Sequence, residues 1–162
     1  MKILGKKSLS SAIEKGLVVL LILGIFITIS VGMWIILDWE KWVGFFLTKT
    51  IFIAYLSSLP VLIMVVEFIK IFQNLKNEKA FDKQNLKFLK VSYIASFTIC
   101  AIYLINTIIL LLDTKWIDTF IVYPMLMAII AIVFFFFGIG LIVLTEIYKK
   151  AIQFKEENEL TI

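Results

Sequence analysis

The chain has 162 residues and a net charge of +4, and 62% of its residues are hydrophobic. A soluble domain is nearer half apolar, and a single soluble core would not bury this much apolar surface. All 16 basic residues are lysine and there is no histidine, which excludes histidine metal sites, imidazole proton relays and Ser–His triads. The single cysteine, Cys100, excludes an internal disulfide and a cysteine-cluster zinc site. The composition therefore predicts one membrane domain, to which we assign no catalytic, cofactor or metal residue.

The chain begins with a short basic segment, 1–15, which is followed by the uncharged run 16–37. At about 1.5 Å per residue this run is long enough to cross a hydrocarbon core of about 30 Å. Ser11 and Glu14 have the spacing of a capping box, so we expect the first helix to begin there. A small residue recurs at every fourth position of one face: Gly24, Thr28 and Gly32. Such faces let membrane helices approach closely, and we expect this one to pack within the chain rather than in a homodimer.

Three further apolar runs, about 48–72, 91–112 and 119–147, are also long enough to span a bilayer. Thirteen of the 16 lysines lie on one side of the four runs: in the N-terminal segment, in and beside the polar loop 73–90, and in the tail 148–162. The positive-inside rule places these segments in the cytosol. The predicted fold is an all-α membrane protein, a bundle of four transmembrane helices with a helical cytosolic extension before the third span.

The four tryptophans all fall on the other side of the predicted membrane. They are Trp34, Trp39, Trp42 and Trp116. This distribution is typical of an aromatic belt, in which amphipathic rings sit at the level of the headgroups. The turns on this side are only a few residues long, so the more specific sequence is concentrated on the cytosolic side.

Four residues of the spans are candidates for an intramembrane role, because polar and helix-breaking groups are uncommon in lipid. They are Pro60, Glu67, Asn106 and Glu146. Pro60 removes a backbone donor and predicts a kink, and Asn106 predicts an interhelical hydrogen bond. Glu67 and Lys70 are three residues apart, so they share a helix face and are expected to pair. The alternative for Glu67 and Glu146 is a role in sensing or transport.

The polar loop 73–90 is the longest break between apolar runs. Asp82 is placed as an N-cap, with Phe81 and Leu86 as a hydrophobic staple. A helix is therefore expected from Lys83 into the third span, with an apolar stripe beside its lysines. This helix has two interpretations: it lies on anionic headgroups, or it is a docking face for a cytosolic protein. The candidate partner-contacting residues are Phe81, Asp82, Lys83, Asn85, Leu86, Lys87, Leu89 and Lys90.

Residues 75–90 resemble the central loop of bacterial membrane proteins grouped as domain of unknown function 2975. In that loop a Phe is followed four residues on by Asn, and then by Leu and basic positions. The matching residues here are Phe81, Asn85, Leu86 and Leu89. The ending 156–162, EENELTI, is similar to that family's acidic-Asn-acidic-Leu-Thr-aliphatic ending. The chain departs from the family at Glu78, where relatives often have Gly, and at Ala80, where they often have Pro.

The resemblance implies no catalytic residue and no cofactor. Members of the family are commonly encoded beside a small helix-turn-helix regulator, which implies a membrane protein that binds or restrains a cytosolic DNA-binding partner. The first hypothesis is therefore a non-enzymatic regulatory or sensor protein that holds this partner through its cytosolic face. The alternatives are a bacteriocin-immunity or toxin-protection protein, and a small transporter or channel subunit.

An enzyme is the least favoured class, because the sequence has no Gly-rich phosphate loop and no metal-ligand cluster. Membrane lipids are expected partners, and a homo-oligomer is an open alternative. Direct nucleic-acid binding is not expected, because membrane topology accounts for the distribution of the lysines.

Overall fold

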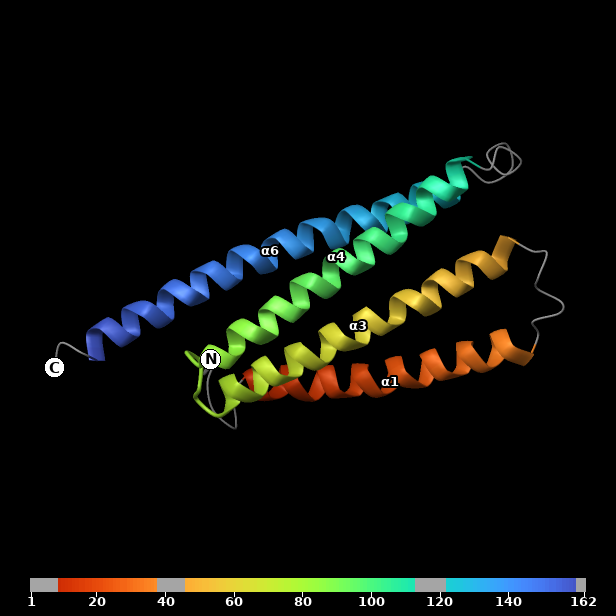
Figure 1. Cartoon of the computed structure of the whole chain (residues 1–162). Coiled ribbons are helices and arrows are strands. Elements are labelled where there is room, and N and C mark those ends of the chain that lie inside the picture. The colour runs from red at the N-terminus through yellow and green to blue at the C-terminus, as the bar shows by residue number, and fades with distance from the viewer. Residues whose placement is uncertain (1–8, 38–45, 113–121, 160–162) are drawn as a thin grey trace.

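Four long α-helices contain the four apolar runs (Figure 1). The computed structural model describes residues 9–37, 46–112 and 122–159. In chain order its helices are α1 (Leu9–Leu37), α3 (Phe46–Lys76), α4 (Lys83–Leu112) and α6 (Val122–Glu159). All four are long and apolar enough to cross a membrane. The predicted all-α bundle of four helices is confirmed, and the chain is a multi-pass membrane protein.

Both terminal helices differ from the predicted boundaries. α1 begins at Leu9, so Ser11 lies inside the helix and the predicted capping box is wrong. The Glu14 carboxylate pairs instead with Lys76 of α3, with 2.8 Å between Oε2 and Nζ. α6 continues through the predicted tail as far as Glu159. With 38 residues at about 1.5 Å each, α6 is about 57 Å long and extends well beyond a hydrocarbon core of about 30 Å.

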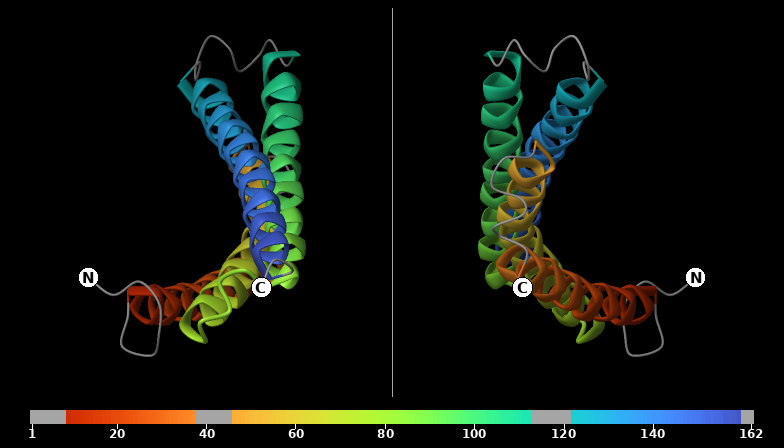
Figure 2. Two further views of the ribbon diagram at one scale, coloured as in Figure 1. Left: turned by 90° about the vertical axis from the view of Figure 1, so that its left-hand side faces the viewer. Right: turned by 90° about the vertical axis from the view of Figure 1, so that its right-hand side faces the viewer.

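The helices pack in the order in which they occur in the chain. α1 packs on α3, α3 packs on α4, and α4 makes its most extensive contact with α6. Figures 1 and 2 show α1 and α6 on opposite sides of α3 and α4, so the bundle is open rather than closed into a ring. Figures 1 and 2 together show that α4 and α6 run at an angle to one another.

The small-residue face of α1 packs within the chain, against α3, as the sequence predicts. A Cβ atom at Gly24 would lie 2.9 Å from Cδ2 of Leu62, and one at Gly32 would lie 3.1 Å from the ring of Tyr55. Thr28, between the glycines, donates its hydroxyl to the carbonyl of Gly24 at 2.8 Å. The two glycines therefore allow a close approach of α1 to α3, which is how helices associate in lipid.

Small residues also line the contact between α4 and α6. Ser92 and Ser96 of α4 are fully buried, and the Ser96 hydroxyl donates to the backbone carbonyl of Phe134 at 2.7 Å. Gly138 of α6 faces Phe97, because a Cβ atom at the glycine would lie 2.9 Å from Cζ of that ring. At this level the contact thus combines close backbone packing with a hydrogen bond between the two helices.

A hydrophobic core lies near one end of the bundle. Ile71, Leu89 and Leu141 are buried there, one each from α3, α4 and α6. Partly buried hydrophobic residues pack around them: Phe68, Leu75, Phe88, Tyr93 and Tyr148. We call the end of the bundle beside this core the lysine-rich end, and we define it as residues 70–90 together with residues 145–159. Along the rest of the described helices many large apolar side chains are exposed, as expected of surfaces that face lipid tails.

Several predictions fall on residues that the structure does not describe. They include most of the aromatic belt (Trp39, Trp42 and Trp116) and the two short turns on that side. Residues 1–8 and 160–162, which hold part of the basic segment and the end of the acidic tail, also lie outside the described residues. Trp34 is described, and its side chain is 40% exposed near the end of α1. The belt as a whole stays a prediction.

Candidate functional site

The loop of the lysine-rich end begins with a left-handed residue that terminates α3. Glu78 has a φ of 61°. The N–H of Lys79 donates to the carbonyl of Asn74 at 2.8 Å, and the N–H of Glu78 donates to the carbonyl of Leu75 at 3.2 Å. These two bonds form a Schellman motif, in which glycine is the usual left-handed residue. The conformation explains why glycine suits this position in the family that the loop resembles.

Asp82 caps the start of α4, which confirms the predicted N-cap. Its Oδ1 accepts the N–H of Gln84 at 2.8 Å, and its carbonyl accepts the N–H of Asn85 at 3.0 Å. α4 begins at the next residue, Lys83. Phe81, expected as half of a staple, packs with the ring of Tyr148 on α6, with 6.3 Å between ring centroids. The loop is therefore connected to α6 as well as to α4.

Asn85 is the centre of the lysine-rich end. Its side chain is fully buried, and its Oδ1 accepts a hydrogen bond from Nδ2 of Asn74 at 2.7 Å. Its Nδ2 donates to the hydroxyl of Tyr148 at 3.0 Å and to the carbonyl of Ala80 at 3.2 Å, with the carbonyl of Lys79 at 3.4 Å. One amide thus connects α3, the loop and α6, and its donors and acceptor are satisfied, as burial requires.

Tyr148 takes part in this network as a neutral phenol, whose oxygen accepts the hydrogen bond from Asn85. Burial, followed by the charge of Asp82, raises the pKa of Tyr148 above its ordinary value, although the hydrogen bond from Asn85 acts in the opposite direction. The phenol is therefore protonated at physiological pH. A neutral hydroxyl matches the neutral amide beside it, so the network contains no buried charge.

The last turns of α6 dock on the loop through apolar and charged contacts. Ile152 is only 4% exposed. The Nζ of Lys83 lies 2.7 Å from Oε1 of Glu156, and their side chains are 70% and 50% exposed. An ion pair as exposed as this contributes about 0–1 kcal/mol. The buried Ile152 and the bond between Asn85 and Tyr148 therefore hold α6 in place more strongly than the ion pair does.

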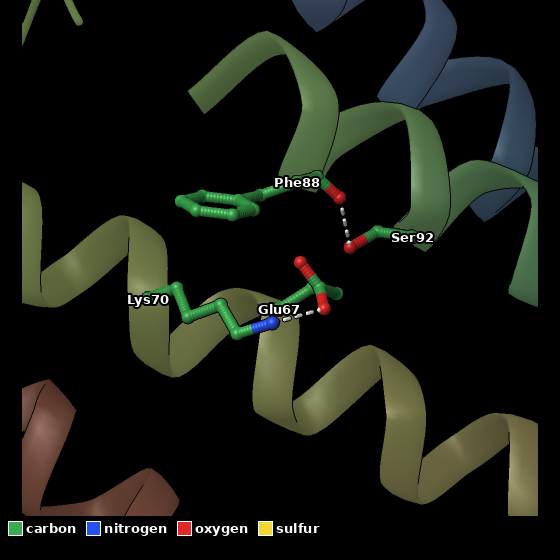
Figure 3. Close-up of polar contacts among 4 residues, drawn as sticks. All are labelled: Glu67, Lys70, Phe88 and Ser92. Atoms are coloured by element: carbon green, nitrogen blue, oxygen red, sulfur yellow. Dashed lines mark hydrogen bonds and ion pairs between the residues drawn. The ribbon is translucent and has the colours of Figure 1, made fainter. Parts of the chain in front are cut away.

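Glu67 and Lys70 of α3 form the predicted pair beside this network (Figure 3). Glu67 is 8% exposed, and its Oε1 lies 2.6 Å from Nζ of Lys70. The same ammonium group lies 5.3 Å from the centroid of the Phe88 ring, within cation–π range. Ser92 is next to Glu67 in Figure 3, but its hydroxyl donates to the carbonyl of Phe88 at 2.9 Å. The pair therefore joins α3 to α4 near the core.

The four intramembrane candidates do not come together. Glu67 is buried and faces α4, whereas Glu146 is exposed on α6. Asn106 is 3% exposed, and its Nδ2 has no hydrogen-bond partner in the described part of the chain, so the predicted interhelical bond from this donor is not formed there. α3 continues as a helix through Pro60. In the same described residues no three Cys, Asp or Glu side chains gather as a metal ion would require.

The structure divides the candidate partner-contacting residues into two groups. Asn85 and Leu89 are 0% and 3% exposed, so they organise the interior and offer no surface to a partner. Asp82 and Leu86 are half-buried. The exposed members are Phe81, Lys83, Lys87 and Lys90. Any docking surface on this loop therefore consists of one aromatic ring and a row of lysines.

Sequence reasoning missed several residues of the lysine-rich end. Asn74 and Tyr148 complete the network of Asn85, yet both lie in polar segments with no pattern that marks them as buried. Glu14 has its partner 62 positions away on α3. Phe154, which is 64% exposed, was hidden in the charged tail. The spacing of Ile152 from Tyr148, four residues, is the one signal that a buried stripe continues into this tail.

These features define the class: a four-span helical membrane protein whose lysine-rich end is organised around a buried asparagine. Residues 36–162 match the model of the family described as Protein of unknown function (DUF2975). The chain belongs to this family. A search of curated proteins and a search of solved structures found no match. The matched region contains α3, α4, α6 and the network of Asn85, whereas nearly all of α1 precedes it.

Proposed function

We propose that this chain is a non-enzymatic regulatory or sensor protein of the bacterial plasma membrane. Its termini and lysine-rich end face the cytosol, and this end holds a small DNA-binding protein of the helix-turn-helix kind. The lysine distribution supports the orientation through the positive-inside rule, and the family resemblance supports the kind of partner. The observation that carries the proposal is the exposure of Phe81 and Phe154 in the part of the chain that projects from the membrane.

The core of the lysine-rich end gives a reference for depth in the membrane. The 20 residues from Val122 to Leu141 cover about 30 Å, the thickness of a hydrocarbon core. Leu141 packs with Leu89, and the exposed Lys90 follows Leu89 directly, so this level is near the hydrocarbon boundary. The headgroup layer adds roughly 5–8 Å. Phe154 lies 13 residues beyond Leu141, about 20 Å along α6, and is therefore outside this layer.

Phe154 is thus exposed where water, and not lipid, surrounds the chain. Phe81 packs on Tyr148, which is seven residues, or about 10 Å, beyond Leu141 along α6. Phe154 is 64% exposed and Phe81 is 48% exposed. Burial of a phenylalanine side chain contributes about 1.5–3 kcal/mol. Exposed aromatic residues on a polar surface are typical of protein interaction sites, where they serve as anchors. A partner with apolar pockets for the two rings would use them as anchors.

α6 offers a route by which the membrane part could alter this surface. It is a single helix from Val122 to Glu159, and its last turns are bonded to the loop through Asn85 and Tyr148. A shift of α6 in the lipid would move Phe154 relative to Phe81. This continuity supports a sensor, in which the arrangement of the spans decides whether the two rings match the partner.

The transporter alternative has weaker support. Glu67 is paired with Lys70, and Glu146 is exposed on the outside of α6. Asn106 is 17 residues along α4 from Leu89, about 26 Å away in depth. Among the described residues these groups do not line one path. No contact described above specifically favours the toxin-protection alternative.

Affinity purification of the tagged protein from gently solubilised bacterial membranes, followed by mass spectrometry, tests the proposal. We expect a small DNA-binding protein to co-purify with the wild-type chain. The double variant Phe81→Ser/Phe154→Ser should recover roughly one tenth of it or less, because anchor aromatics typically contribute 2 kcal/mol or more.

The matched control is Gln84→Ser/Gln153→Ser, which changes exposed polar residues close to the same two positions. This control should recover the wild-type amount and keep the wild-type melting temperature. The phenylalanine variant should still unfold in a single transition, at a modestly lower temperature because Phe81 packs on Tyr148. Equal recovery with the phenylalanine variant contradicts the docking surface. A wild-type preparation without any DNA-binding protein contradicts the proposed partner.

A further inference from the structure

The first turns of α4 have two opposite faces. Asn85, Leu89 and Ser92 recur at helical spacing on the buried face. The other face carries an exposed row at the same spacing: Lys83, Lys87, Lys90 and Ile94. Residues three and four apart share a face of a helix. The lysine row therefore continues directly into a side chain, Ile94, that is 50% exposed in the membrane-spanning part.

The three lysines of this row lie at different depths. Leu89 marks the hydrocarbon boundary, and Lys90 is next to it. Lys87 is two residues further from the membrane, about 3 Å, and Lys83 is six residues further, about 9 Å. With a headgroup layer of roughly 5–8 Å, Lys87 lies within this layer. Lys90 is one residue on the hydrocarbon side of Leu89, and its long side chain reaches the same layer. Lys83 lies at or beyond the outer edge of that layer.

The three lysines also differ in whether they form an ion pair. Lys83 pairs with Glu156 of α6 at 2.7 Å. Lys87 and Lys90 are exposed and form no ion pair within residues 9–37, 46–112 and 122–159. α4 is one helix from Lys83 into its span, so this segment does not lie flat on the membrane. The two unpaired ammonium groups instead cross the headgroup layer on a helix that is already in the bilayer.

We propose that Lys87 and Lys90 form a binding site for the phosphate group of an anionic phospholipid. The phosphate oxygens accept hydrogen bonds from the two ammonium groups, which act as strongly hydrated point charges. One acyl chain follows the lipid-facing side of α4 past Ile94. The site is separate from the proposed partner surface, because Phe81 and Phe154 lie further from the membrane.

Native mass spectrometry of the full chain in detergent, titrated with dioleoyl phosphatidylglycerol, measures this binding. Lys87→Gln/Lys90→Gln should weaken the affinity by about 25-fold, or about fivefold for each lysine, which corresponds to about 1 kcal/mol each. Dioleoyl phosphatidylcholine, a zwitterionic lipid, should bind more weakly and respond little to the change. Inorganic phosphate at the same concentration should not displace the anionic lipid, because it lacks the acyl chains.

The matched control is Lys79→Gln/Lys83→Gln, which removes the same charge from exposed positions outside the headgroup layer. It should change the affinity by less than about twofold, since salt and water screen these more distant charges. Lys87→Arg/Lys90→Arg keeps the charge and should keep most of the binding, which separates lost charge from misfolding. Equal weakening in both glutamine variants, weakening in neither, or displacement by inorganic phosphate overturns the proposal. The proposal is also overturned if Lys87→Gln/Lys90→Gln leaves the lipid affinity unchanged but no longer recovers the DNA-binding protein in the affinity purification. The two lysines would then belong to the docking surface.

Discussion

The contact between α1 and α3 and the contact between α4 and α6 join neighbouring helices in different ways. α1 approaches α3 through Gly24 and Gly32, with the pair of Glu14 and Lys76 near one end. α4 and α6 also pack through small residues, but at the lysine-rich end Asn85 adds hydrogen bonds to three elements. Lipid supplies no hydrophobic force between helices, so both contacts need close packing. The part that projects towards water adds the buried polar network of Asn85, which specifies one arrangement of the loop.

The family match also distinguishes α1 from the other three helices. It covers residues 36–162 and so includes α3, α4 and α6, but almost none of α1. In the most apolar window of α1 no residue is buried in the protein, whereas 22–28% of the corresponding windows in the other three helices are buried. The matched region therefore contains the three helices around Asn85, and α1 packs beside them on α3.

Replacing Asn85 should cause the largest loss of stability among the changes proposed for these two contacts. Asn85→Ala leaves Asn74, Tyr148 and the carbonyl of Ala80 without their partner in a buried site. Each such group costs about 1–3 kcal/mol, and partial access to water brings the expected loss of stability to about 2–4 kcal/mol. Equilibrium unfolding in detergent measures it. The control Gln84→Ala, at an exposed position in the same turn, should stay within about 0.5 kcal/mol; an equal loss in both would mean that the network does not organise this end.

Replacing glycines that face a neighbouring helix should have an effect of intermediate size on stability. Gly138→Leu should destabilise the contact between α4 and α6 by about 1–3 kcal/mol, because a Cβ atom there already lies 2.9 Å from a phenylalanine ring. Gly140→Leu should be close to neutral, because nothing lies within 4 Å. In α1, Gly24→Leu should also destabilise the protein more than Gly16→Leu does. The difference in stability between these two variants should be smaller than in α6, since α1 packs mainly on one neighbour. Thermal unfolding in detergent distinguishes the four variants, and equal melting of Gly138→Leu and Gly140→Leu would contradict the close contact.

The smallest expected effect is a gain in stability at the loop. Glu78→Gly removes the left-handed strain at φ 61°, which costs about 1–2 kcal/mol for a residue with a Cβ atom. Glycine also gives the unfolded chain more freedom, so the net gain should be roughly 0.5–1 kcal/mol. The adjacent Lys79→Gly has no positive φ to relieve and should not stabilise the protein. A decrease in stability on Glu78→Gly would show that the side chain of Glu78 contributes more than its conformation costs.

The features that were predicted correctly are local ones. The four apolar helices follow from run length, the cap at Asp82 follows from residue type, and Glu67 and Lys70 pair because they are three positions apart on one helix. The capping box at Ser11 was wrong although its spacing was right. The acid of that motif, Glu14, has a lysine of another helix as its partner, and no spacing within the first helix shows this.

The number of possible membrane crossings and the side on which the lysines lie can be predicted from the sequence. Length, hydropathy and lysine position act through the solvent and not through specific neighbours. The sequence did not determine that Asn85 points inward, or that Tyr148 and Asn74 meet it. These outcomes were decided by the tertiary structure, in which α6 extends past the membrane and closes over the loop. A buried amide must find partners from whatever elements surround it, and only the packing of α3, α4 and α6 brings those partners together.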